Sequence, residues 1–188
     1  MKDKETEYKK DNKEGLVIIN TGGGKGKTTA ALGLALRAAG HGQKVLILQF
    51  IKGAWKTGES KIMKRLTPEI EMEQLGKGFI KVEDGKLQIT EKDIKNAEGT
   101  LLYAKEKINS GKYDMVILDE INNIISYGLV DVNVVLDIIK KRPVGLDLVL
   151  TGRGAPDKLI DIADTVSEIR EIKHAYSKGI KAKKGIEY

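Results

Sequence analysis

Short runs of consecutive apolar residues alternate along this chain with longer segments whose apolar residues repeat at helical spacing. The apolar runs, typical of strands buried on both faces, cover residues 16–20, 44–50, 114–120 and 146–152, with weaker ones at 70–75 and 165–172. The helical segments cover residues 28–40, 58–66, 90–111, 130–142 and 155–163. This alternation predicts an α/β fold in which helices cover both faces of a mostly parallel sheet.

A polar arm at residues 1–14 precedes one predicted domain at residues 15–188. The chain has 188 residues, the size of a single α/β domain. The arm mixes lysines with acids and has no apolar face, so we expect it to be mobile until something covers it. Right-handed crossovers place the carboxyl ends of the strands at one edge of the sheet, where ligands bind.

Composition excludes several classes of function. The chain has no cysteine, which rules out disulfides, thiolate metal sites and a cysteine nucleophile, and its two histidines, His41 and His174, are far apart in sequence. No apolar run approaches the roughly 18 residues that cross a bilayer, and the N-terminus is not a secretory signal. We therefore expect a cytoplasmic protein with no membrane partner.

The formal net charge of +6 indicates an anionic partner, and the excess of basic residues lies at the C-terminal end. Nucleic acid is one candidate. Aromatic residues make up only 5% of the chain and do not interleave with basic ones as in proteins that stack bases. We therefore expect no nucleic-acid partner, since a polyphosphate site or a solvated basic surface explains the charge equally well.

The run TGGGKGKTT at residues 21–29 resembles a phosphate-binding P-loop, with Thr21 where the usual pattern begins with glycine. Glycines at 22, 23, 24 and 26 allow backbone N–H groups to turn inward, and the following helix directs its positive end to the same point. Lys27 adds a charge, and Thr28 offers a hydroxyl to a phosphate-bound Mg²⁺. With a strand before it and a helix after it, the motif predicts a P-loop NTPase-like (RecA-like) α/β fold.

Four further polar residues follow predicted strands, and three of them, Asp119, Glu120 and Arg153, lie at the same predicted edge of the sheet. Asp119 and Glu120 come directly after an apolar run, where either carboxylate can hold Mg²⁺ directly or through water. Arg153, between two glycines, can reach a phosphate with its planar donor fork. His174 can transfer protons, although a lone histidine near lysines is more often simply solvated or hydrogen-bonded.

Seven segments in order resemble the bacterial P-loop ATP:corrinoid adenosyltransferases, which act on cob(I)yrinic acid a,c-diamide or cob(I)alamin. They are TGGGKGKTTAALGLALRAAGHG, QFIKGAWKTGE, LGKGF, VILDEINN, LTGRGAP, ADTVSEI and KHAYSKGIKAKKGIEY. The resemblance covers roughly residues 15–188. It implies transfer of the 5′-deoxyadenosyl group of ATP to cobalt(I), release of inorganic triphosphate, and a role in cobalamin biosynthesis or salvage.

By this resemblance the loop holds a leaving group, so its donors face the charge that grows on the triphosphate. The implied ATP-binding residues are Gly22, Gly23, Gly24, Lys25, Gly26, Lys27, Thr28, Thr29 and Arg153. Lys27 is the implied catalytic cation, and Thr28 with Asp119 or Glu120 is the implied site for Mg²⁺ or Mn²⁺. Cobalt(I) is itself the nucleophile, so the reaction needs no enzyme base.

The resemblance also implies partners and a corrin side of the site. The N-terminal arm is similar to a family segment that folds over the active site of the partner subunit in a homodimer, and a protein such as a flavodoxin would supply the electron. Phe79 would lie on the lower face of the corrin and displace the lower cobalt ligand. Two positions depart from the family pattern, which has tryptophan where this chain has Lys81 and glutamine where it has Lys183.

Two other functions fit part of the pattern. A P-loop ATPase or kinase would attack the γ-phosphate, with Glu120 polarising water or an acceptor hydroxyl, and would release ADP instead of triphosphate. A non-catalytic ATP-dependent RNA binder or corrinoid carrier would show salt-sensitive retention without ATP turnover. Neither explains the segments QFIKGAWKTGE and LGKGF, which by the resemblance lie near the corrin, or the C-terminal segment KHAYSKGIKAKKGIEY.

Overall fold

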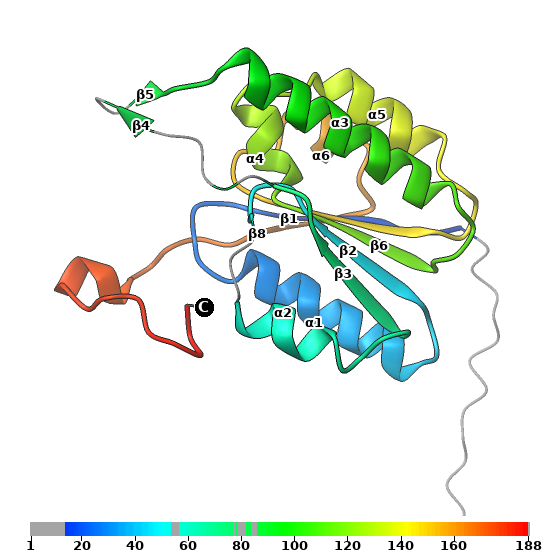
Figure 1. The fold of residues 1–188 in the computed structure, drawn as a ribbon, viewed down its shortest axis with the longest axis horizontal. Coiled ribbons are helices and arrows are strands. Elements are labelled where there is room, and N and C mark those ends of the chain that lie inside the picture. Colours follow the sequence, from blue (N-terminus) through cyan, green and yellow to red (C-terminus); the bar gives the residue numbers. More distant parts are fainter. Residues whose placement is uncertain (1–13, 54–56, 77, 79–81, 84–85, 188) are drawn as a thin grey trace, which may run out of the picture.

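Six parallel strands form the central sheet in the order β3-β2-β6-β7-β1-β8 (Figure 1). The computed structural model describes residues 14–53, 57–76, 78, 82–83 and 86–187. The strands are β1 (Val17–Thr21), β2 (Val45–Gln49), β3 (Ile70–Gln74), β6 (Met115–Asp119), β7 (Asp147–Thr151) and β8 (Thr165–Glu168). A separate antiparallel pair joins β4 (Val82–Glu83) to β5 (Lys86–Leu87).

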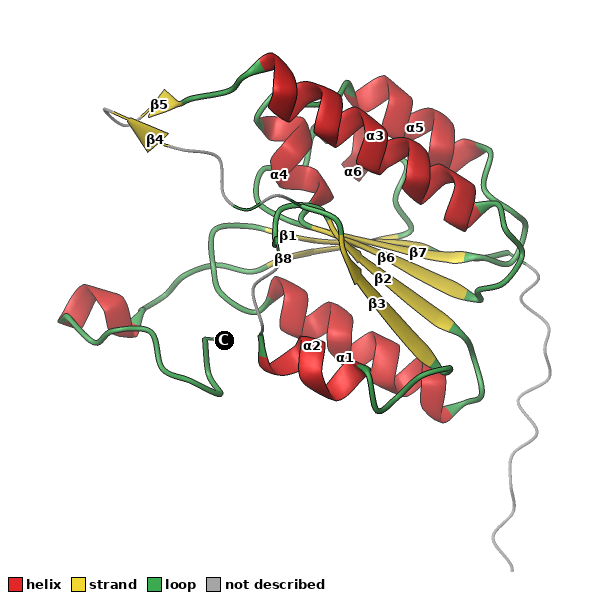
Figure 2. Ribbon diagram, in the orientation of Figure 1, coloured by secondary structure: helices red, strands yellow, loops and turns green. Residues whose placement is uncertain are grey.

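Helices cover both faces of the sheet, as the alternation of the sequence predicts (Figure 2). One face carries α1 (Lys27–Gly40) and α2 (Gly58–Met63). The other carries α3 (Glu91–Ile108), α4 (Ile121–Ser126), α5 (Val132–Lys140) and α6 (Asp157–Ile160). A short 3-10 helix, η1 (Ala175–Lys178), lies in the C-terminal segment that runs out from β8. The α/β prediction is confirmed.

The central strands are apolar on both faces because each face packs against helices. Every residue of β2 and of β6 is buried. Alternate residues of these strands enter two separate cores: Ile47 and Ile117 pack on the α1 face, whereas Leu48 and Leu118 pack on the face of α3, α4 and α5. Burial on both faces explains why these runs do not alternate with polar residues.

A row of polar side chains ends the strands on the α1 face. Gln49 pairs in register with Asp119 on β6 and with Gln74 on β3, and Asn20 pairs with Thr151 on β7. These residues follow the apolar residues of the α1 face by two positions, so their side chains point the same way. The sheet therefore presents a polar rim beneath the loop between β1 and α1.

Helix ends follow the sequence signals closely. Thr90 begins α3 with a capping box, in which Thr90 Oγ1 accepts from the Asp93 N–H and Asp93 Oδ2 accepts from the Thr90 N–H. Beyond α3, Gly111 takes the left-handed conformation at φ 69°. Among the described residues no helix is long and apolar enough to span a bilayer. The predicted arm at 1–14 lies outside the described residues except for Glu14.

Two sequence predictions about local structure are corrected. The last strand, predicted over 165–172, ends at Glu168 because its neighbour β1 ends at the paired residue Thr21 and leaves no strand to continue the ladder. The helix α4 was not predicted; its buried Ile121, Ile124 and Ile125 have helical spacing, but six residues are too few for a periodic signal.

The burial of Leu118 and the exposure of Leu102 predict different losses of stability when each is replaced by alanine. Leu118 lies in the middle of the sheet with no exposed surface, so Leu118→Ala should lower the free energy of unfolding by about 2–5 kcal/mol through lost burial and a residual cavity. Urea unfolding measures this change. Leu102→Ala is the matched control, because Leu102 is 59% exposed on α3 and its loss should change stability by less than about 0.5 kcal/mol. Equal losses for the two variants would contradict the packing described.

Candidate functional site

The loop between β1 and α1 has the conformation of a phosphate-binding loop. Gly26 precedes α1 in the left-handed region at φ 119°, and among the described residues no side-chain cap hydrogen bond is made at the start of the helix. Lys27 extends back over the loop and its Nζ donates to the carbonyl oxygens of Gly22 and Gly24 at 2.8 and 2.7 Å. Uncapped amides, the positive end of a helix and an ammonium group thus converge on one place, where an anion is stabilised.

Two of the loop glycines are required by close packing against the chain beyond β8. A Cβ on Gly22 would lie 2.4 Å from the Ile169 carbonyl oxygen, and one on Gly24 would lie 2.7 Å from the Arg170 carbonyl carbon. Gly24 also donates its N–H to Ile169 O at 2.8 Å, so this amide is bonded to the protein rather than turned toward a ligand. Around Gly23 and Gly26 a Cβ would meet nothing within 4 Å.

Asp119 joins the loop helix to the sheet through hydrogen bonds from three side chains. Its Oδ1 accepts from Thr28 Oγ1 at 2.8 Å and from Thr151 Oγ1 at 2.7 Å, and its Oδ2 accepts from Gln49 Nε2 at 2.9 Å. The carboxylate is fully buried. Since Thr28 gives its proton to Asp119, the lone pairs of its hydroxyl oxygen face away from the carboxylate.

The side chain of Glu120, next to Asp119 in the sequence, is not fully hydrogen-bonded within the described residues. Glu120 occupies the left-handed region at φ 69°, and its N–H donates to Thr151 Oγ1 at 2.9 Å. Its Oε2 is buried and has no hydrogen-bond partner in the described part of the chain. Burial, together with the adjacent charge of Asp119, raises the pKa of Glu120 to about 7. A buried, unpartnered carboxylate oxygen in a strained backbone position is typical of a functional site.

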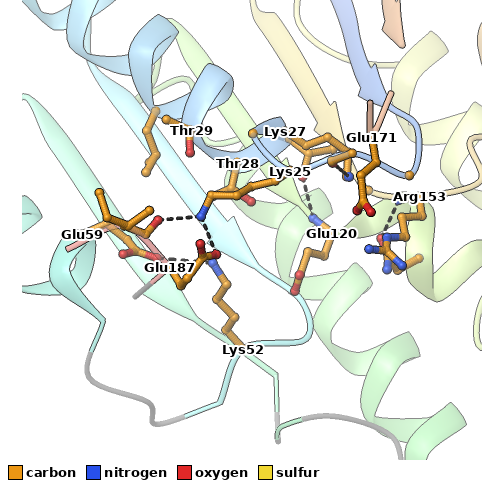
Figure 3. A pocket seen from close by; sticks show the side chains of 18 of the residues that line it. Lys25, Lys27, Thr28, Thr29, Lys52, Glu59, Glu120, Arg153, Glu171 and Glu187 are labelled. Carbon is orange, nitrogen blue, oxygen red and sulfur yellow. Dashed lines mark hydrogen bonds and ion pairs between the residues drawn. The ribbon is translucent and has the colours of Figure 1, made fainter. Parts of the chain in front are cut away.

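These groups line a pocket of about 570 Å³ (Figure 3). Of the residues predicted for the site, the pocket is lined by Gly23, Gly24, Lys25, Gly26, Lys27, Thr28, Thr29, Glu120 and Arg153. Gly22 and Asp119 lie behind this lining, in contact with Lys27 and Thr28 respectively. Arg153 is held at its backbone, where its N–H donates to Asn123 Oδ1 at 2.8 Å. The structure therefore gathers the predicted nucleotide residues in one place.

Lys27 and Arg153 lie close enough in the pocket for their charges to interact. Burial lowers the pKa of Lys27, and the positive charge of Arg153 lowers it further, while Glu120 and Asp119 oppose the change. Two cations held near each other in a partly buried pocket favour a polyvalent anion between them.

Lys25 contacts the C-terminal segment of the chain. Its Nζ donates to the Ile186 carbonyl oxygen at 2.6 Å and lies 2.5 Å from Glu187 Oε2 (Figure 3). The segment of Gly185, Ile186 and Glu187 thereby forms one wall of the pocket. His174 also lines it and accepts the Tyr176 N–H at its Nδ1, which caps η1. The basic C-terminal region therefore lies at the phosphate loop.

Sequence reasoning missed several polar residues of this site, among them Thr151, Gln49, Lys52 and Glu59. Gln49 binds Asp119, and Lys52 lines the pocket with its Nζ 3.3 Å from Glu59 Oε1 and 3.9 Å from Asp119 Oδ2. The available signal was position at the carboxyl end of an apolar strand, since Gln49 ends β2 and Lys52 follows three residues later. Phe79, predicted for the corrin side, and the departure at Lys81 lie outside the described residues.

The donor set fits a hard divalent cation. Within the described residues no group of three or more His, Cys, Asp or Glu side chains could hold a metal. Mg²⁺ needs fewer protein ligands, because it keeps waters and phosphate oxygens and takes one or two protein groups. The unpartnered Oε2 of Glu120 and the outward lone pairs of Thr28 Oγ1 are oxygens of this kind.

Fold and site together define a P-loop nucleotide-binding α/β protein. In fold, the chain is similar to a KaiC-like protein from Pyrococcus horikoshii OT3, with a TM-score of 0.52 and 19% identity over 86% of this chain and 76% of that one.

The family assignment is more specific than the fold. The model of the ATP:corrinoid adenosyltransferase BtuR/CobO/CobP family matches residues 13–188. Proteins named corrinoid adenosyltransferase are 38% identical in Pseudomonas aeruginosa, over 94% of this chain and 85% of that protein, and 39% identical in Escherichia coli strain K12, over 94% and 87%. The chain belongs to the ATP:corrinoid adenosyltransferase family.

The raised pKa of Glu120 predicts how pH affects stability. The folded protein keeps this proton up to about pH 7, whereas the unfolded chain releases it near the ordinary value of 4.5. The free energy of unfolding therefore falls as the pH rises between these values. Glu120→Gln removes this loss, so its stability relative to the unchanged protein should rise by about 3 kcal/mol between pH 4 and pH 8.

Urea unfolding with EDTA across this pH range measures the difference. Glu168→Gln is the matched control, because Glu168 is exposed at the end of β8 and its removal should leave the pH dependence unchanged. Parallel pH curves for Glu120→Gln and the unchanged protein would contradict the environment described for Glu120.

Proposed function

We propose that this protein transfers the 5′-deoxyadenosyl group of ATP to the cobalt(I) of a corrinoid and releases inorganic triphosphate. The observation that carries this proposal is the pocket itself, in which loop amides, Lys27 and Arg153 surround a space for linked phosphates. Membership in the ATP:corrinoid adenosyltransferase family supplies the second substrate.

The reaction breaks one bond and forms one. The electron pair of cobalt(I) attacks the 5′ carbon of ATP, a cobalt–carbon bond forms, and the bond from that carbon to the triphosphate oxygen breaks. The leaving triphosphate takes the electron pair, so negative charge grows on its oxygens. The ammonium of Lys27 and the N-terminal amides of α1 stabilise that charge without rearranging during the step.

The nucleophile is a metal-centred electron pair, so no side chain has to remove a proton. The residues of the pocket instead position the triphosphate and exclude water around it. In our proposal Arg153 and Lys25 contact the nucleotide, with Lys25 exchanging Glu187 for a phosphate oxygen. Thr28 and Glu120 would hold Mg²⁺ or Mn²⁺, which when bound neutralises part of the triphosphate charge.

The corrin side and the assembly are part of the same proposal. Phe79 would face the lower side of the corrin, a protein such as a flavodoxin would supply the electron, and the arm at 1–14 would cover the site of a second copy. Exposed apolar side chains on the C-terminal segment, including Ile172 and Tyr176 at 94% and 76%, support a homodimer. We place the protein in the cytoplasm, where ATP is available.

Lys27→Ala should abolish the reaction. Its ammonium bridges two loop carbonyls at the pocket and is directed to where charge grows, so its loss should slow product formation by at least about 100-fold. The assay mixes protein, Mg-ATP and a strongly reduced corrinoid, and follows the light-sensitive cobalt–carbon product by absorbance.

The control variant is Lys112→Ala, which removes an exposed lysine outside the pocket and should leave the rate unchanged. Product formation by Lys27→Ala at the unchanged rate would remove the loop from the reaction. Absence of a cobalt–carbon product from the unchanged protein would overturn the proposed function as a whole.

A further inference from the structure

A chain of side-chain hydrogen bonds runs beneath the pocket from the edge of the sheet to Asp119. Gln74 on the edge strand β3 donates its Nε2 to Gln49 Oε1 at 3.1 Å, and Gln49 on β2 donates its Nε2 to Asp119 Oδ2 at 2.9 Å. The strand register places the three residues directly opposite one another. Gln49 is fully buried and does not line the pocket.

The direction of these hydrogen bonds is fixed by chemistry. An ionised carboxylate only accepts, so the amide nitrogen of Gln49 must face Asp119 and its oxygen must face β3. Gln74 then has to present its own amide nitrogen to that oxygen. Asp119 therefore sets the orientation of the Gln49 amide, and the hydrogen bond from Gln74 holds the other end of that amide in place.

The orientation of Gln49 affects the pocket through Asp119, which contacts both Gln49 and Thr28. With Oδ2 bonded to Gln49, Oδ1 faces the hydroxyls of Thr28 and Thr151. The hydroxyl proton of Thr28 is thereby committed to Asp119, and the lone pairs of its oxygen are left for the proposed divalent cation. Side chains that orient a metal ligand from behind commonly set the affinity of the site.

We propose that Gln49, held by Gln74, is a positioning residue for the metal-dependent part of nucleotide binding. It acts through Asp119 and Thr28, and touches neither the nucleotide nor the cation. The inference rests on the proposed function for the presence of a divalent cation and of ATP. A purely structural glutamine would stabilise the sheet equally but would leave the coupling between Mg²⁺ and ATP unchanged.

Calorimetric titration of the full chain with ATP, once with Mg²⁺ and once with EDTA, separates the two roles. In the unchanged protein Mg²⁺ should tighten ATP binding. Gln49→Met keeps the length of the side chain but removes the donor, and it should reduce the gain in ATP affinity that Mg²⁺ provides by roughly 10–100-fold. ATP binding in EDTA depends on the loop and Lys27, so it should change by less than about threefold.

Thermal unfolding shows whether Gln49→Met folds normally. Two further variants test the inference if it does not. Gln49→Leu also removes the donor, and should also lose the Mg²⁺ effect. Gln74→Met removes the hydrogen bond to Gln49 Oε1, so the Gln49 side chain is held less firmly and part of the Mg²⁺ effect should be lost. Gln43→Met is the control, because Gln43 lies between α1 and β2, outside both the hydrogen-bond chain and the pocket.

Full Mg²⁺ coupling in a folded Gln49→Met or Gln49→Leu variant, while the unchanged protein shows the same coupling, would overturn the inference and leave the proposed function intact. Absence of any Mg²⁺ effect on ATP binding in the unchanged protein would overturn the metal part of the proposed function, and the inference with it.

Discussion

The buried carboxylate of Asp119 is the interaction on which the site depends. It accepts hydrogen bonds from Gln49 on β2, from Thr151 on β7 and from Thr28 on α1, and so ties the phosphate-loop helix to three adjacent strands. A buried charge is tolerated only when it is well paired, and three donors supply that pairing here. The position of the loop relative to the sheet is therefore fixed before any ligand arrives.

The two neighbouring carboxylates, Asp119 and Glu120, therefore have different environments and different roles. Asp119 is satisfied by the protein and serves to orient Thr28, whereas Glu120 keeps a buried oxygen without a partner and a pKa raised to about 7. A divalent cation beside Glu120 would favour its ionised form, so metal binding and ionisation support each other. A loop built in this way holds phosphates as a rigid unit, which suits a reaction in which the whole triphosphate departs.

Much of this could be predicted from the sequence because the relevant signals are local. The glycine loop, the apolar run before Asp119 and the capping box at Thr90 each lie within a few residues. The role of Gln49 could not be predicted, because it arises from the register of three strands that are far apart in the chain. The bond from Gly24 to Ile169 and the contact of Lys25 with Glu187 likewise depend on where the C-terminal segment packs.

The central claim is that the loop holds triphosphate as a leaving group, and the phosphorus-containing products test it most directly. Phosphorus NMR of a reaction with Mg-ATP and reduced corrinoid should show inorganic triphosphate accumulating in a one-to-one ratio with the alkylated corrinoid, with no ADP formed at that rate. Accumulation of ADP, with or without free phosphate, while the cobalt stays unalkylated would contradict the account and would make the protein an ATPase or kinase.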